Sequence, residues 1–249
     1  MTVEGQTSDD EIVDRTSGVA LRRVVVGPLA TNCWIVHAPD ERAALVVDPG
    51  DEPDRILAAC RGLDVTAVVL THAHWDHVLG LPAVSSALRL PVLAHPAEAA
   101  VWAGECHHLR RRGHWDAGTA TADLLAIDPA ALTPPPDRQL WDGATRPLHD
   151  GEQLHVGPLT VTARHTPGHT PGGLTLELPG HLLTGDTLFP GGPGLTGTQW
   201  PDSDFPTILR SVERLLAAPG ATVVHPGHGR DTTVAHERPS VPDWRTRGW

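Results

Sequence analysis

The seven residues Thr71-His72-Ala73-His74-Trp75-Asp76-His77 carry the strongest structural signal in this 249-residue chain. They follow a continuous apolar run at residues 65–70, which indicates a strand buried on both faces. They precede residues 78–88, whose apolar spacing is typical of a helix. The motif therefore lies on a strand-to-helix loop, and loops of this kind place their side chains at the carboxyl end of a sheet.

The spacing within this loop predicts metal ligands. His72 and His74 are two residues apart, so an extended loop can turn both imidazoles toward one ion. Asp76 and His77 follow directly and can reach a second ion. A lone histidine in a chain with 16 of them is an ordinary surface or core residue, but the whole motif would arise by chance in only a few chains per thousand, roughly.

Three further segments repeat the same design of a short apolar strand, a Gly/Pro turn and one polar side chain. The strands are expected at residues 159–163, 181–183 and 222–225. Glycine lets the backbone pass close to an ion, and proline stiffens the turn. Nitrogen and carboxylate oxygen are the donors expected for zinc, iron or manganese. The side chains that follow these strands are His169, Asp186 and His228.

Composition limits the possible partners and the compartment. The formal net charge is −11, from 19 basic and 30 acidic residues, which argues against nucleic acid as a partner. No segment approaches eighteen consecutive apolar residues, so no membrane span is expected. The three cysteines form no C-x-x-C pair, which favours a reducing, cytoplasmic location. A small molecule is therefore the expected partner, and the sequence leaves the oligomeric state open.

The chain is expected to form one α/β domain over residues 19–249, preceded by a flexible tail at residues 1–18. Residues 104–147 have little periodicity and are interpreted as an insertion over one face. Within it, Trp115 and Trp141 either pin the loop to the domain or form a lid that selects substrates. Residues 237–249 are polar and contain two prolines, so we expect a second tail there.

These motifs resemble those of the metallo-β-lactamase superfamily, and within it those of the glyoxalase II-like branch. The resemblance covers nearly the whole chain. It includes Val47-Asp48-Pro49-Gly50, the motif at residues 71–77, Thr166-Pro167-Gly168-His169-Thr170, Gly185-Asp186-Thr187-Leu188-Phe189 and Pro226-Gly227-His228-Gly229, in the family's order. The implied fold is an αββα sandwich in which two mixed sheets are flanked by helices, with the site at one edge of the sheets.

The resemblance also implies a set of ligands for two divalent metal ions. Zinc is the expected metal, with iron or manganese as alternatives. Asp186 would bridge the two ions and, with Asp76 as a possible proton acceptor, would be a catalytic residue. Asp186 stands where the broad-spectrum zinc β-lactamases have a cysteine, which disfavours lactam hydrolysis. The first metal would be held by His72, His74 and His169, and the second by Asp76, His77 and His228.

The function expected from these residues is hydrolysis of a small activated acyl compound, most simply a thioester, by attack of a metal-bound hydroxide. The sequence shows no arginine-containing segment of the kind that family thioesterases carry after Gly185–Phe189, and it has no tyrosine. Glutathione specificity is therefore not implied. The alternatives are a mononuclear iron persulfide dioxygenase, a hydrolase of another ester or lactone, and a metal-stabilised binding module without enzymatic activity.

Overall fold

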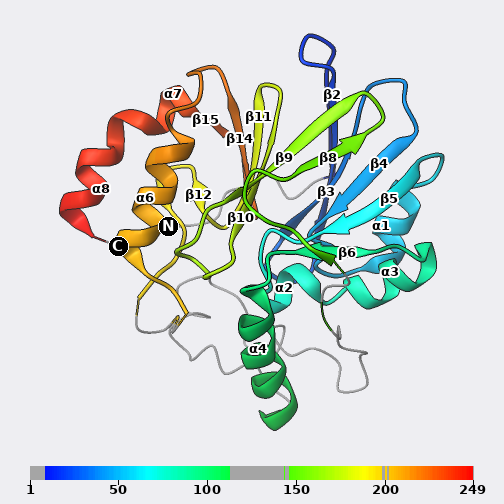
Figure 1. Ribbon diagram of the computed structural model, residues 1–249, viewed down its shortest axis with the longest axis horizontal. Coiled ribbons are helices and arrows are strands. Elements are labelled where there is room, and N and C mark those ends of the chain that lie inside the picture. The colour runs from blue at the N-terminus through cyan, green and yellow to red at the C-terminus, as the bar shows by residue number, and fades with distance from the viewer. Residues whose placement is uncertain (1–8, 113–142, 144–145, 198–199, 201, 249) are drawn as a thin grey trace.

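The computed structural model describes residues 9–112, 143, 146–197, 200 and 202–248. Two mixed sheets form its centre, and helices cover the outer face of each (Figure 1). This arrangement is the αββα sandwich expected from the sequence. Among the described residues, the longest helices are too short or too polar to span a lipid bilayer.

The first sheet has seven strands in chain order. Neighbours from β1 to β4 pair antiparallel, and neighbours from β4 to β7 pair parallel. The parallel strand β4 is apolar and almost wholly buried, as is expected when both faces of a strand are covered, whereas β5 is buried only over its second half, because Asp64 and Thr66 are exposed. The strands are β1 (Asp10–Asp14), β2 (Val19–Val26), β3 (Thr31–His37), β4 (Ala43–Val47), β5 (Asp64–Val69), β6 (Val92–Ala94) and β7 (Arg146–Pro147).

The second sheet has six strands in the order β15-β14-β11-β10-β9-β8. All of its pairs are antiparallel except β11 and β14, which run parallel. A small hairpin of β12 (Leu188–Phe189) and β13 (Gly192–Pro193) follows β11. The six strands are β8 (Gln153–Val156), β9 (Leu159–His165), β10 (Leu174–Leu178), β11 (His181–Gly185), β14 (Val223–Pro226) and β15 (Thr232–Thr233).

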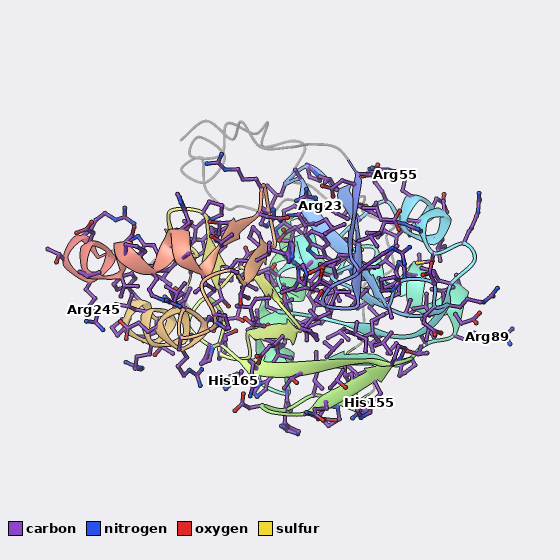
Figure 2. The ribbon with its side chains drawn as sticks, turned by 90° about the horizontal axis from the view of Figure 1, so that it is seen from above. Arg23, Arg55, Arg89, His155, His165 and Arg245 are labelled. Atoms are coloured by element: carbon purple, nitrogen blue, oxygen red, sulfur yellow. The ribbon has the colours of Figure 1, made fainter. Side chains whose placement is uncertain are left out.

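Three apolar cores hold the layers together. The central core lies between the sheets, where Trp34 and Leu45 of the first sheet belong to the same cluster as Leu176 of the second. A second core joins the first sheet to α1 (Pro53–Ala59), α2 (Trp75–Val78) and α3 (Leu81–Leu88). A third joins the second sheet to α6 (Phe205–Leu215) and α8 (Val241–Arg247). Figure 2 shows the two outer layers at opposite ends, marked by Arg89 after α3 and Arg245 on α8.

The structure differs from the sequence expectations at both ends of the chain. Asp10–Asp14 of the expected N-terminal tail forms β1, which pairs with β2. The expected C-terminal tail begins at the last residue of α7 (Val234–Glu237) and forms the 3-10 helix η2 (Arg238–Ser240) and α8. Trp244 of α8 is 2% exposed and belongs to the third core. Buried Trp244, together with the buried and hydrogen-bonded Glu237, therefore holds a segment whose polar composition suggested a tail.

The expected insertion also begins differently. The sequence predicted little regular structure from residue 104 onward. Instead, α4 (Glu98–Arg112) continues for fifteen residues. The rest of the insertion, including Trp115 and Trp141, lies almost entirely outside the described residues, so the lid hypothesis stays a prediction.

Candidate metal centre

The side chains predicted as ligands lie at one edge of the sandwich, where strands of both sheets end. Four of them occupy the loop after β5 and the first turn of α2. The others follow β9, β11 and β14 of the second sheet. The two sheets meet here directly, because the backbone N–H of Asn32 on β3 donates to the carbonyl of Gly227 at 2.7 Å. The fold therefore brings the four separated sequence segments to one place.

His72, His74 and His169 form a first cluster. One ligand atom from each lies within 4.8 Å of the others. Nε2 of His169 is 2.9 Å from Nδ1 of His74, and the ring centroids of His72 and His169 are 5.0 Å apart. All three side chains are buried. Three nitrogens that converge in this way can hold one divalent ion and leave a position open.

Asp76, His77 and His228 form a second cluster of the same size. Nε2 of His77 lies 3.4 Å from Nε2 of His228, and Nε2 of His228 lies 3.2 Å from Oδ2 of Asp76. His228 is the most exposed of the three, with 22% of its side chain accessible.

Asp186 lies between the two clusters. Its Oδ2 is 3.6 Å from Nε2 of His169 in the first cluster and 3.6 Å from Nε2 of His228 in the second. Its Oδ1 is 3.6 Å from Nε2 of His77. The carboxylate of Asp186 therefore faces both clusters, as a bridging ligand must.

Unpaired polar atoms test whether metal ions fit this centre. Among the described residues, Nε2 of His72 and Oδ1 of Asp186 are buried without a hydrogen-bond partner. Buried polar atoms are normally paired, so both atoms require a partner of another kind. Gly227 leaves room for the carboxylate, since a Cβ there would lie 2.1 Å from Oδ1 of Asp186. The donors, their convergence and these orphaned atoms all suit two divalent cations.

The electrostatics differ between the clusters. Burial, and then the neighbouring His169, lower the pKa of His74 to about 3. Burial also lowers the pKa of His72 well below its usual value, so these imidazoles are neutral donors. In the second cluster burial acts in the same direction on His77, but the carboxylates of Asp76 and Asp48 outweigh it and raise the pKa to about 8. In the second cluster the positive charge of protonated His77 therefore balances part of the negative charge of Asp76 and Asp48 when no cation is bound.

Supporting residues around the ligands were missed at the sequence level. Asp48, noted only as part of a strand-turn motif, accepts hydrogen bonds from the backbone N–H and hydroxyl of Thr71 at 2.7 and 2.6 Å. Its Oδ2 is also 2.9 Å from Nδ1 of His77. Asp48 groups with His72 and His77 as a possible ligand, but these bonds make it a support that orients His77. In the sequence, the only feature that pointed to Asp48 was its place directly after an apolar strand.

Backbone carbonyls and a hydroxyl orient three other ligands. Nδ1 of His169 is 2.8 Å from the carbonyl of Leu195, and Nδ1 of His228 is 3.0 Å from the carbonyl of Leu29. These contacts leave Nε2 of each ring facing the centre. The hydroxyl of Thr31 donates to Oδ2 of Asp76 at 2.9 Å.

Two other histidines near the motifs lie away from the clusters. His165 stacks on His95 with 4.2 Å between ring centroids and contacts the carbonyl of Pro171. His225 is fully buried, and its Nε2 faces Nδ1 of His181 at 3.0 Å. Neither supports a ligand in the described structure.

The sequence pattern of the metallo-beta-lactamase superfamily matches residues 26–228 of this chain. The chain belongs to that superfamily. The match contains every predicted ligand, and it confirms the family expected from the motifs. The superfamily binds divalent metals, which agrees with the clusters described above.

Individual relatives agree with this assignment. A probable metallo-hydrolase of Bacillus subtilis, YqgX, is 31% identical over 89% of this chain and 95% of its own length. Hydroxyacylglutathione hydrolase GloC of Haemophilus influenzae is 30% identical over 85% of this chain and 91% of its own. The solved structure of TTHA1623 in a di-iron-bound form has a TM-score of 0.66 and is 34% identical, covering 87% of this chain and 96% of that chain. This superfamily member therefore resembles metal-dependent hydrolases over most of its length.

Proposed function

We propose that this chain is a dinuclear metal-dependent hydrolase of a small activated acyl substrate, and that the substrate is a thioester. The observation that carries the proposal is the position of Asp186, whose carboxylate faces both clusters and keeps one oxygen unpaired. Each cluster adds three ligands of its own and shares Asp186 with the other cluster, so neither ion has four private protein donors as in a closed structural site, and the shared group leaves room for water. Open positions favour catalysis over a purely structural role.

The chain's own residues would hold and orient the two ions. His72, His74 and His169 would bind the first ion. Asp76, His77 and His228 would bind the second, with Asp186 shared. When bound, divalent ions in such a centre lower the pKa of water and polarise a carbonyl oxygen. Zinc is the metal we propose, and the di-iron-bound relative makes iron the first alternative to test.

The leaving group decides between substrate classes. The chain contains no tyrosine and no lysine, so neither of these side chains is available to protonate a departing alkoxide or amine. A thiolate needs no such acid, because the pKa of a free thiol is only about 8.5. The absence of these acids therefore supports a thioester over an ordinary ester or amide. The name of the Haemophilus influenzae relative, a hydrolase of an acylated thiol, points to the same class.

The second cluster argues against the mononuclear iron alternative. A single-iron dioxygenase would need only the first cluster with Asp186. Here Asp76, His77 and His228 also converge, and His77 and Asp76 have dedicated partners in Asp48 and Thr31. We therefore place the dinuclear hydrolase first.

The test combines metal analysis with a substrate panel. Protein purified without chelator is expected to contain two metal ions per chain. Thioesters, lactones, phosphodiesters and a persulfide are then offered in parallel, with oxygen uptake recorded. Thioester cleavage without oxygen uptake supports the proposal. A single iron with oxygen consumption, or protein that binds no metal at all, would overturn it.

A further inference from the structure

Helix α4 carries two buried carboxylates that the proposed chemistry does not use. Glu98 is 1% exposed and Glu105 is 8% exposed. They are seven residues apart, which places them on the same face two turns along the helix. Burial of an ionisable group is costly unless the group is hydrogen-bonded. Both carboxylates are bonded, and both bond the backbone beside the metal centre.

Glu98 connects the two loops that hold the first cluster. Its Oε2 accepts a hydrogen bond from the backbone N–H of Ala73 at 2.6 Å. Ala73 is the residue between His72 and His74. The other oxygen, Oε1, accepts from the backbone N–H of Gly172 at 2.7 Å. Gly172 lies three residues after His169, so one carboxylate joins the segments that supply all three ligands of this cluster.

The loop around residue 172 is shaped to admit this carboxylate. A Cβ at Gly172 would lie 2.7 Å from Oε1 of Glu98 and 2.9 Å from its backbone nitrogen. Contacts that short do not occur, so any side chain at this position would push the loop away from the helix. Glycine is needed here for close approach to α4.

Glu105 contacts the same region from the next part of the helix. Its Oε2 accepts from the backbone N–H of Trp75 at 3.2 Å. Trp75 lies between His74 and Asp76. In Figure 1 α4 starts beside α2 and runs away from the sheets. The helix therefore supports the ligand loop from outside the sandwich.

We propose that Glu98 is a positioning residue that sets the metal affinity of the first cluster by fixing its two loops relative to each other. The inference rests on the proposed metal centre. The two oxygens of Glu98 accept from backbone N–H groups of both loops, at 2.6 and 2.7 Å, and these two hydrogen bonds fix the loops at one point. Ligands must be held to within about 0.5 Å for tight binding, and loss of such a support costs roughly 10- to 100-fold in metal affinity.

The test replaces Glu98 by glutamine. Glutamine keeps the size of the side chain but has only one acceptor oxygen, so one of the two backbone N–H groups loses its partner. The control is Glu237→Gln. Glu237 is also 1% exposed and accepts two hydrogen bonds, from Gly191 and Thr232, but it contacts neither histidine loop.

The first readout needs no metal. Amide hydrogen exchange at Ala73 and Gly172 in the metal-free protein is expected to be faster in Glu98→Gln than in wild type, and unchanged in Glu237→Gln. Unchanged exchange at both amides would overturn the inference. The exchange measurement tests the contacts of Glu98 even if the proposed function is wrong.

The second readout is the affinity for Zn²⁺ in a His228→Ala background, which removes one ligand of the second cluster and leaves the first intact. Glu98→Gln is expected to weaken binding there about 10- to 100-fold, and Glu237→Gln to leave it unchanged. Equal affinity with and without Glu98, or an equal loss in the Glu237 control, would overturn the inference. Wild-type protein that binds no Zn²⁺ would instead overturn the proposed metal centre.

Discussion

At the scale of single residues, Asp186 has the most demanding position. It faces His169 and His228, which belong to different clusters, and its Oδ1 is unpaired. Burial alone would raise the pKa of this carboxyl, but His228 and then His77 outweigh burial, and the pKa lies well below its usual value. The carboxylate is therefore ionised and available as a shared donor for two cations.

Replacing Asp186 by Ala should remove the proposed bridge and most of the activity. Loss of several kcal/mol of transition-state stabilisation corresponds to a catalytic rate that is lower by roughly a thousandfold or more. Steady-state kinetics and metal analysis on the same preparation are the measurement. The exposed Asp54→Ala on α1 is the control and should match wild type. Wild-type turnover in Asp186→Ala would show that the bridging role is assigned to the wrong residue.

Residue-level prediction from the sequence named seven candidate ligands that the structure brings together, but it missed the residues that support them. The seven side chains were recognisable because each follows an apolar strand and a tight turn, a pattern that is local in the chain. Glu98 has no such pattern. Its partners are backbone N–H groups of Ala73 and Gly172, 25 and 74 residues away, and any residue type offers such a group. Only the folded chain shows which amides a buried carboxylate meets.

At the scale of elements, β11 and β14 are joined by a buried histidine pair. Nδ1 of His181 lies 3.0 Å from Nε2 of His225, so a single proton can lie between the two nitrogens. Asp14 of β1 is 3.3 Å from Nε2 of His181, and Asp231 is 3.0 Å from Nδ1 of His225. Burial, and then the neighbouring His225, lower the pKa of His181.

This lowered pKa predicts a pH dependence of stability. Below about pH 6.5 the unfolded chain binds a proton at His181 that the folded chain binds less readily. Stability should therefore fall as the pH falls from about 7 to 5, and His181→Gln should make that fall shallower. Urea unfolding at several pH values measures the free energy of unfolding, with the exposed His155→Gln as the control. The same change of stability with pH in wild type and in His181→Gln would contradict the prediction.

A second element-scale feature is the segment after β13, which brings Trp200 to the first cluster. Its ring centroid lies 5.6 Å from that of His74 and 6.1 Å from that of His169. Trp200 is partly exposed. The predicted lid tryptophans, Trp115 and Trp141, lie outside the described residues, whereas Trp200 was not singled out in the sequence.

Trp200→Ala should raise KM about tenfold for substrates with an apolar acyl group, because contact with a large apolar side chain contributes about 1.5 kcal/mol. Metal content should stay the same, since no ring nitrogen of the clusters depends on Trp200. Kinetics over acyl groups of increasing size measure the effect. Trp200→Phe keeps an aromatic surface and should behave nearly as wild type. Loss of metal, or an unchanged KM for every acyl group, would count against this role.

Element boundaries could be predicted where the apolar pattern was continuous. The expected strand at residues 65–70 and β5 (Asp64–Val69) agree to within one residue at each end, and the apolar second half of β5, residues 67–69, is the part that is buried. The pattern failed for α4 and α8. Both helices are largely polar and are held by a few buried groups, among them Glu98 and Trp244. Helices of this kind have little amphipathic periodicity, so their tertiary contacts determine their extent.

At the scale of the whole molecule, the candidate metal centre joins the two sheets. The loop after β5 belongs to the first sheet, while the loops after β9, β11 and β14 belong to the second. Each cluster takes ligands from both sides. His74 and His169 meet at 2.9 Å across this boundary, and His77 and His228 meet at 3.4 Å. Bound ions would therefore cross-link the sandwich at the edge where the sheets approach each other.

This arrangement predicts that metal removal lowers stability as well as activity. The unfolded chain does not hold these ligands together, so an ion present at about 100 times its dissociation constant stabilises the folded state by about 2.7 kcal/mol per site. Two sites would raise Tm by roughly 10–20 °C for a chain of this length. Calorimetry before and after chelation measures the shift, and added Zn²⁺ should restore it. His228→Ala, which weakens only the second cluster, should show about half the shift. Equal Tm values with and without chelator would mean that no ion links the two sheets, since a ligand that binds only the folded state must stabilise it.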